Sequence, residues 1–128
     1  MSKEEIKILL VDDEKQFVDT LAERLAMRGF SARVAYDGPQ ALKAVEEPTD
    51  VIVLDLRMPG MSGADVQDHL MRRRIDAPFI FITGHGDVPQ AVQAFKKGAM
   101  DFIQKPFQQP QLQKLVDRAM RTAKELFA

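Results

Sequence analysis

The sequence predicts an α/β fold in which five parallel strands alternate with five helices. Short apolar runs recur along the chain, and the segments between them carry apolar residues at helical spacing. Two of the runs, residues 51–55 and 79–83, are apolar up to a polar last residue, which is typical of strands buried on both faces of a parallel sheet. Strands and helices alternating at these lengths predict a parallel sheet covered by helices on both faces.

The five predicted strands differ in strength. The run 31–35 mixes apolar and polar residues, so we expect it near an edge of the sheet. The run 101–104 is short and closes on a Lys-Pro pair. The predicted strands cover residues 6–11, 31–35, 51–55, 79–83 and 101–104.

The predicted helices are bounded by residues that favour helix ends. Gly29 ends the first as a left-handed cap, Pro39 stands early in the second, Ser62 caps the third and Gly98 ends the fourth. The last helix keeps its apolar period up to the final residues, so we expect the natural chain to continue beyond Ala128.

The composition indicates one ordinary globular domain, residues 1–128. Hydrophobic residues make up 45% and charged residues 29%, and the formal net charge is −1, which leaves no electrostatic footprint for nucleic acid or an anionic membrane. Cysteine is absent, so disulfides and thiolate metal sites are excluded. The sequence lacks a signal peptide and an apolar run long enough to span a membrane, and we expect a cytoplasmic protein.

Polar residues that suit one reaction follow four of the five strands. Asp12 and Asp13 follow the first strand, Asp55 ends the third, Thr83 ends the fourth and Lys105 follows the fifth. Because the carboxyl ends of parallel strands meet at one edge, where ligands bind, we expect an acidic crevice flanked by a hydroxyl and an ammonium group.

Clustered carboxylates repel one another unless a cation separates them. Oxygen ligands without His or Cys select Mg²⁺, or Mn²⁺, over zinc. Asp55 could then serve as a nucleophile that carries a phosphoryl group, whose oxygens would contact the cation, Lys105, Thr83 and the backbone of Gly84.

Each of these residues also has an ordinary structural interpretation. A single Asp at a strand end is commonly a turn or cap residue, and an Asp pair before a helix is commonly an N-cap favoured by the helix dipole. The functional hypothesis depends on their joint occurrence at one edge of one sheet.

The chain resembles, from end to end, the response-regulator receiver domains of bacterial two-component signalling. The matching motifs are LVDDE at 10–14, VLDLRMPGMSG at 53–63, ITG at 82–84 and KPF at 105–107. The segments TGHGDVP at 83–89 and GAMDFIQKPF at 98–107 resemble receivers of the nitrogen-fixation and nitrogen-regulation transcription factors. The resemblance implies a flavodoxin-like, doubly wound (βα)5 sheet with strand order 2-1-3-4-5.

The same resemblance implies a role for each matching residue. Asp55 would accept a phosphoryl group from a sensor histidine kinase or a small phosphodonor, and Thr83 with Lys105 would contact it. The Lys105–Pro106 bond would be cis. The Mg²⁺ ligands would be Asp12, Asp13, Asp55 and the backbone carbonyl of Arg57.

A switch would follow from phosphorylation. Thr83 would move inward, Phe102 would fill the vacated space, and the fourth helix, fifth strand and fifth helix would present a changed face. That face would serve a homodimer or an output domain, and DNA would be bound only through an effector domain outside this chain. An ordinary core role for Phe102 is the structural alternative.

Other functions stay open at this point. The chain could be a stand-alone regulator or a phosphorelay intermediate that acts through protein contacts. A small aspartyl-phosphate phosphatase would need a second carboxylate two residues after the nucleophile, where this chain has Arg57, and a cap over the substrate. A flavodoxin-like binding protein would need a phosphate loop after the first strand, where this chain has acids. His85 and Arg57 could both tune the access of water to Asp55.

Overall fold

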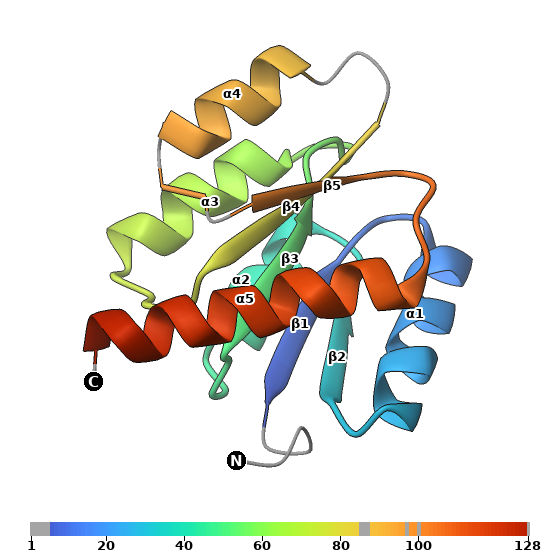
Figure 1. Ribbon diagram of the computed structural model, residues 1–128. Coiled ribbons are helices and arrows are strands. Elements are labelled where there is room, and N and C mark those ends of the chain that lie inside the picture. Colours follow the sequence, from blue (N-terminus) through green and yellow to red (C-terminus); the bar gives the residue numbers. More distant parts are fainter. Residues whose placement is uncertain (1–5, 85–87, 97, 100, 128) are drawn as a thin grey trace.

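Five parallel strands form one sheet in a computed structural model that describes residues 6–84, 88–96, 98–99 and 101–127. The strands are β1 (Lys7–Val11), β2 (Ser31–Ala35), β3 (Val51–Asp55), β4 (Phe79–Thr83) and β5 (Asp101–Gln104). The helices between and after them are α1 (Lys15–Met27), α2 (Gly38–Ala44), α3 (Gly63–Arg72), α4 (Val88–Lys96) and α5 (Gln109–Phe127). The strand order β2-β1-β3-β4-β5 confirms the predicted fold, with β2 at an edge (Figure 1).

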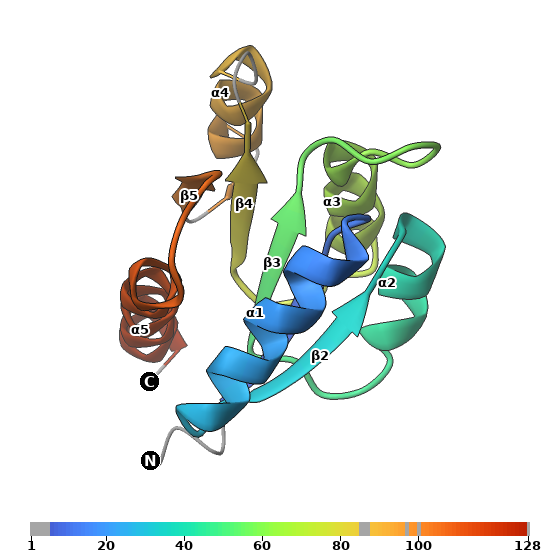
Figure 2. The same ribbon diagram turned by 90° about the vertical axis from the view of Figure 1, so that its right-hand side faces the viewer.

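The sheet is covered on both faces because its buried side chains alternate. In β1, Ile8 and Leu10 belong to the core cluster that includes residues of α1 and α5, whereas Leu9 and Val11 belong to the cluster that includes residues of α2, α3 and α4. Figure 2 shows α5 on one side of the sheet and α2 with α3 on the other. All five residues of β3 are buried, and full burial of each Val, Ile or Leu contributes roughly 1.5–3 kcal/mol before entropy is counted.

The strand register brings the carboxyl ends of the strands to one edge. Val11 at the end of β1 pairs with Leu54, the residue before Asp55. Asp55 in turn pairs with Ile82, the residue before Thr83. Val11 and Thr83, the last residues of β1 and β4, therefore each lie within one residue of the level of Asp55 in the sheet.

The helix ends confirm the expected signals. Ser62 and Asp65 form a reciprocal capping box at the start of α3, in which each side chain accepts a hydrogen bond from the other residue's backbone N–H. Gly29 follows α1 with φ +94°, a conformation that glycine adopts at low cost. Among the described residues, no helix has both the length and the apolar character needed to cross a bilayer.

The start of α3 packs against the backbone that carries Asp55. Gly63 donates its N–H to the carbonyl of Leu56 at 3.0 Å. A Cβ atom at position 63 would lie against the carbonyl oxygen of Asp55 and 2.8 Å from the Cα of Leu56. The missing side chain therefore lets α3 approach closely and hold the loop that follows β3.

We expect Gly63→Ala to lower the free energy of unfolding by about 1–3 kcal/mol, the range for overpacking. Helix propensity alone has the opposite sign and would favour alanine by about 1 kcal/mol. Urea denaturation followed by circular dichroism measures the change, and Ala64→Gly reports the propensity effect at the adjacent position. An unchanged or raised stability of Gly63→Ala would contradict the close approach.

Candidate functional site

Backbone hydrogen bonds beyond the strand ends position the polar residues of the crevice. The N–H of Asp12 donates to the carbonyl of Ala35 at 3.1 Å, and the N–H of Lys105 donates to the carbonyl of Thr83 at 2.8 Å. Asp55 is itself the last residue of β3. The sheet thus brings Asp12, Asp55, Thr83 and Lys105 to one edge, as predicted.

Three carboxylates cluster in this crevice. Asp12 is 0% exposed and Asp55 is 8% exposed, whereas Asp13 lies at the surface. One oxygen from each of the three lies within 4.8 Å of the others. Two buried like charges at this separation need a counter-charge.

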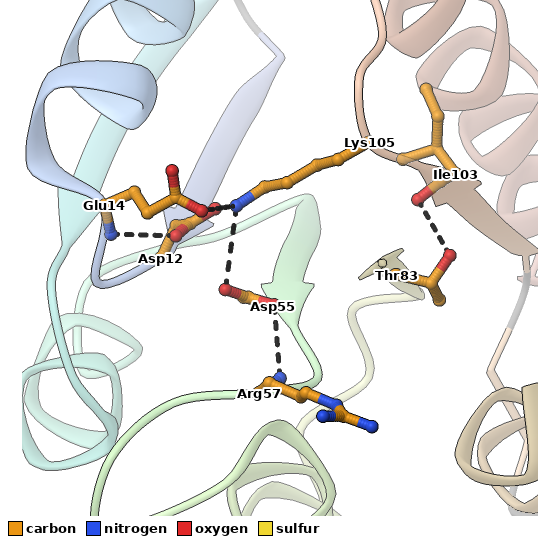
Figure 3. A network of polar contacts seen from close by, with 7 residues as sticks. All are labelled: Asp12, Glu14, Asp55, Arg57, Thr83, Ile103 and Lys105. Atoms are coloured by element: carbon orange, nitrogen blue, oxygen red, sulfur yellow. Dashed lines mark hydrogen bonds and ion pairs between the residues drawn. The ribbon is translucent and has the colours of Figure 1, made fainter. Parts of the chain in front are cut away.

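Lys105 supplies a positive charge to the cluster. Its Nζ lies 2.7 Å from Oε1 of Glu14, 2.9 Å from Oδ2 of Asp12 and 3.9 Å from Oδ2 of Asp55 (Figure 3). Burial alone would lower the pKa of this ammonium group, but Glu14 and Asp12 together raise it above its ordinary value. Lys105 is therefore charged and bound to acids of the β1–α1 segment more closely than to Asp55.

Sequence reasoning missed the partners that α1 offers to Lys105. The sequence presents Glu14 only within the motif LVDDE and gives no reason to single out Phe17. In the structure, Nζ of Lys105 lies 4.6 Å from the centroid of the Phe17 ring, a cation–π contact. Phe17 packs edge-on against Phe107 at a centroid distance of 5.5 Å. The signal in the sequence was the motif LVDDE, which places Glu14 one residue beyond the Asp pair.

Asp55 holds its proton more tightly than an ordinary carboxyl group. Burial, and then the charge of Asp12, raise its pKa from 3.8 to about 7, against the opposing effects of the Arg57 N–H and of Lys105. The Arg57 N–H donates to Oδ1 of Asp55 at 3.2 Å. A second positive charge in the crevice would favour the ionised form that a nucleophile requires.

The residues present fit a hard divalent cation. The donors are carboxylate oxygens without His or Cys, the set that Mg²⁺ and Mn²⁺ prefer. Oδ1 of Asp12 accepts a hydrogen bond from the N–H of Glu14 at 2.9 Å. Its buried Oδ2 makes an ion pair with Lys105 but accepts no hydrogen bond from the described part of the chain. A cation bound beside it would share this oxygen with Lys105.

The remaining predicted residues lie around the crevice without facing it. The Thr83 hydroxyl donates to the carbonyl of Ile103 at 3.4 Å, so it is turned toward β5 and away from Asp55 (Figure 3). The exposed Arg57 side chain also points away from Asp55. Gly84 directly follows β4.

The last of the predicted positions lie on and after β5. The side chain of Phe102 is 45% exposed, so the core alternative for it is wrong. The Lys105–Pro106 peptide bond is cis. His85 lies outside the described residues.

A groove of about 560 Å³ adjoins the crevice on the side of α1. Its lining includes Glu14, Phe17, Leu21, Arg24 and Phe107. Glu14 and Phe17 contact Lys105 as well, so the groove and the crevice share two residues.

A doubly wound sheet with clustered carboxylates and a lysine at its carboxyl edge defines a flavodoxin-like domain suited to hold a cation and an anionic group. The chain belongs to the response regulator receiver domain family, whose model matches residues 8–117. It is therefore part of two-component signalling, in which sensor kinases phosphorylate receiver domains, and its class is that of a signalling switch.

Relatives agree with this assignment. The chain is 43% identical over 111 residues to the transcriptional regulatory protein FixJ of Rhizobium meliloti (strain 1021), covering 86% of this chain and 54% of FixJ. It is 38% identical over 122 residues to an NtrX-like response regulator of Rickettsia bellii (strain RML369-C), covering 93% of this chain and 26% of that protein. The chain thus spans about half or a quarter of these regulators, and they support the nitrogen-fixation and nitrogen-regulation subtype.

A solved structure agrees with the fold. The crystal structure of a response regulator receiver domain protein from Clostridium thermocellum matches with a TM-score of 0.89 at 29% identity, covering 95% of this chain and 99% of that one. The match extends over nearly the whole of both chains, so the flavodoxin-like receiver fold is shown.

The raised pKa of Asp55 makes stability depend on pH in the metal-free protein. The folded state keeps this proton up to about pH 7, whereas the unfolded chain releases it near 3.8. The free energy of unfolding therefore falls as pH rises through this window and stays low above it.

We expect Asp55→Asn, in the presence of EDTA, to raise the free energy of unfolding at about pH 8 by on the order of a few kcal/mol. The gain should fall to a small part of this value at about pH 4, close to the unfolded-state pKa of 3.8, because the carboxyl group is then neutral in the folded state and partly neutral in the unfolded chain. Urea denaturation at both pH values measures it, with Asp76→Asn at the opposite edge of the sheet as control. A gain that is equal at both pH values would show that Asp55 is not the titrating group.

Proposed function

We propose that Asp55 is the phosphoryl acceptor of this receiver domain. The observation that carries the proposal is the placement of a buried carboxylate at the end of β3, beside Asp12 and within 3.9 Å of the Lys105 ammonium. A carboxylate in such a site has few competing hydrogen bonds and a cation at hand to balance the charge that it gains.

The proposed step is an in-line displacement at phosphorus. A carboxylate oxygen of Asp55 forms a bond to the phosphorus atom of a phosphohistidine, and the P–N bond breaks. The leaving imidazole keeps the electron pair and takes a proton from solvent. With acetyl phosphate the broken bond is P–O and acetate leaves. Lys105 neutralises charge on the transferred group, so this chain contributes positioning and electrostatics.

We propose that Asp12, Asp13, Asp55 and the backbone carbonyl of Arg57 hold Mg²⁺, with Mn²⁺ as a substitute. When bound, the cation would supply charge neutralisation for the acids and for the phosphoryl oxygens. The three clustered carboxylates support the assignment, as does the buried Oδ2 of Asp12, whose contact among the described residues is the ion pair with Lys105.

We propose that the output is carried by the face formed by α4, β5 and α5. Phosphorylation adds roughly 1.5–2 negative charges at Asp55. The Thr83 hydroxyl would leave Ile103 to bind a phosphoryl oxygen, together with the backbone N–H of Gly84. The adjacent Phe102 would then turn into the space beside Thr83. Its present exposure of 45% leaves it able to move without disrupting the core.

The proposed partners are a sensor histidine kinase, a second copy of this chain through the α4-β5-α5 face, and an output domain that acts on transcription. FixJ is named as a transcriptional regulatory protein, and this chain covers 54% of it. DNA would be bound through that output domain, and the whole would act in the cytoplasm.

Phosphorylation at Asp55 is tested by incubation with acetyl phosphate and Mg²⁺. We expect a stoichiometric mass increase by intact mass spectrometry, and a loss of at least about tenfold in its rate for Asp55→Asn, because the nucleophile is gone. EDTA or Asp13→Ala should suppress it as strongly, because the cation is lost.

The control is Asp76→Asn, which removes a carboxylate from an exposed position before β4 and should react like the parent. Modification of Asp55→Asn at the parental rate would show that another residue accepts the phosphoryl group. If EDTA left the rate of modification unchanged, the reaction would not require the proposed cation.

The output face is tested by Phe102→Ala. We expect phosphorylation to proceed normally while dimerisation of the phosphorylated protein weakens by about tenfold or more, the effect of losing one aromatic anchor. Sedimentation velocity with beryllofluoride, a mimic of the phosphoryl group, measures it. Met71→Ala on α3 removes a side chain of similar exposure, 46%, away from the face and should dimerise like the parent. Equal behaviour of the two variants would contradict the role of Phe102.

A further inference from the structure

The ammonium group of Lys105 is held by the first turn of α1. Its shortest contact is to Glu14, at 2.7 Å, and the ring of Phe17 lies one helical turn further on, at 4.6 Å from Nζ to the centroid. The distance to Oδ2 of Asp55, at 3.9 Å, is the longest of its three acid contacts. Figure 3 shows Lys105 reaching across to Glu14 and Asp12, with Asp55 below it.

Glu14 occupies this position for a local reason. It is the N-cap residue of α1, and its backbone N–H donates to Oδ1 of Asp12. That hydrogen bond fixes where the chain turns from β1 into α1, and the Glu14 side chain then meets Lys105 across 91 residues of sequence. The two positions are set by different parts of the fold, so their contact is a property of the folded state.

We propose that Glu14 is a positioning residue that holds Lys105 in a resting place beside α1 and competes with the phosphoryl group on Asp55 for its ammonium. The proposal rests on the phosphoacceptor function of Asp55. Phe17 forms the apolar side of the resting place. Because Glu14 and Phe17 also line the groove along α1, a partner seated there would act on the same competition.

The ion pair between Glu14 and Lys105 is weak enough for a phosphoryl group on Asp55 to displace it. The Glu14 side chain is 63% exposed and that of Lys105 is 21% exposed, so solvent screens the pair. Exposed ion pairs contribute little, up to about a fivefold change in an equilibrium constant. A phosphoryl group with roughly twice the charge of a carboxylate can displace Glu14, but only after overcoming this penalty.

The test is the affinity for beryllofluoride at saturating Mg²⁺, followed by fluorine NMR. We expect Glu14→Gln, which keeps the shape and removes the charge, to bind about two- to fivefold more tightly than the parent. Glu23→Gln makes the same charge change at an exposed position further along α1 and should bind like the parent. Equal affinity of parent and Glu14→Gln would overturn the proposal.

A double-mutant cycle separates competition for Lys105 from a general loss of negative charge. With Lys105→Met as the background, Glu14→Gln should no longer change the affinity. The same gain in both backgrounds would show that Glu14 acts on the anion directly, which overturns the positioning role.

The resting place has a spectroscopic signature that requires no phosphorylation. When the Lys105 ammonium group lies over the Phe17 ring, the ring current of Phe17 moves the chemical shifts of the Lys105 ε-protons upfield. We expect Glu14→Gln to reduce this upfield shift in the free protein, and Glu23→Gln to leave it unchanged. An undiminished shift in Glu14→Gln would overturn the proposal even if the cycle were too weak to measure. If the parent itself failed to bind beryllofluoride, the phosphoacceptor function would be wrong, and the shift would still report on the resting place.

Discussion

Two buried carboxylates at the ends of neighbouring strands are the constraint on which the rest of the site depends. The β1–β3 register places Asp12 beside Asp55, and burial removes the water that would otherwise screen them. Such a pair is costly without a positive charge, so part of the cost appears as the raised pKa of Asp55. The remainder is offset by Lys105, which the cross-strand hydrogen bond to Thr83 holds at the same edge. The site therefore keeps an excess of negative charge that a further positive charge would stabilise.

One lysine is shared among more acids than it can neutralise. Lys105 contacts Glu14, Asp12 and Asp55 at increasing distances, and the most exposed of these carboxylates has the shortest contact. A divalent cation at the three aspartates would reduce the demand on Lys105 and favour the ionised form of Asp55. The cation and the lysine would then have separable roles: the cation would stabilise the acids before reaction, and Lys105 would meet the charge that the reaction adds.

The strands, the helix caps and the meeting of polar residues at one edge could be predicted because they depend on local pattern and on the geometry of parallel sheets. The strand order came from the family resemblance, since alternation alone leaves several windings open. The preference of Lys105 for Glu14, the turn of Thr83 toward Ile103 and the exposure of Phe102 could not be predicted. They depend on side-chain torsions that are set by contacts between residues far apart in sequence. The spacing of residue types along the chain carries no information about these torsions.

Short chains of contacts connect the surroundings of Asp55 to two surfaces. On one side, Lys105 joins the crevice to Glu14 and Phe17 and so to the groove along α1. On the other, the Thr83 hydroxyl is bound to the carbonyl next to Phe102. In the proposed switch, each path would depend on one side chain that exchanges its present partner for the phosphoryl group, which is the kind of two-state element that a switch requires. If Asp55 is phosphorylated as proposed, the gain of roughly two negative charges would favour new partners for both side chains at once, so that entry of the signal and its output would share one electrostatic event.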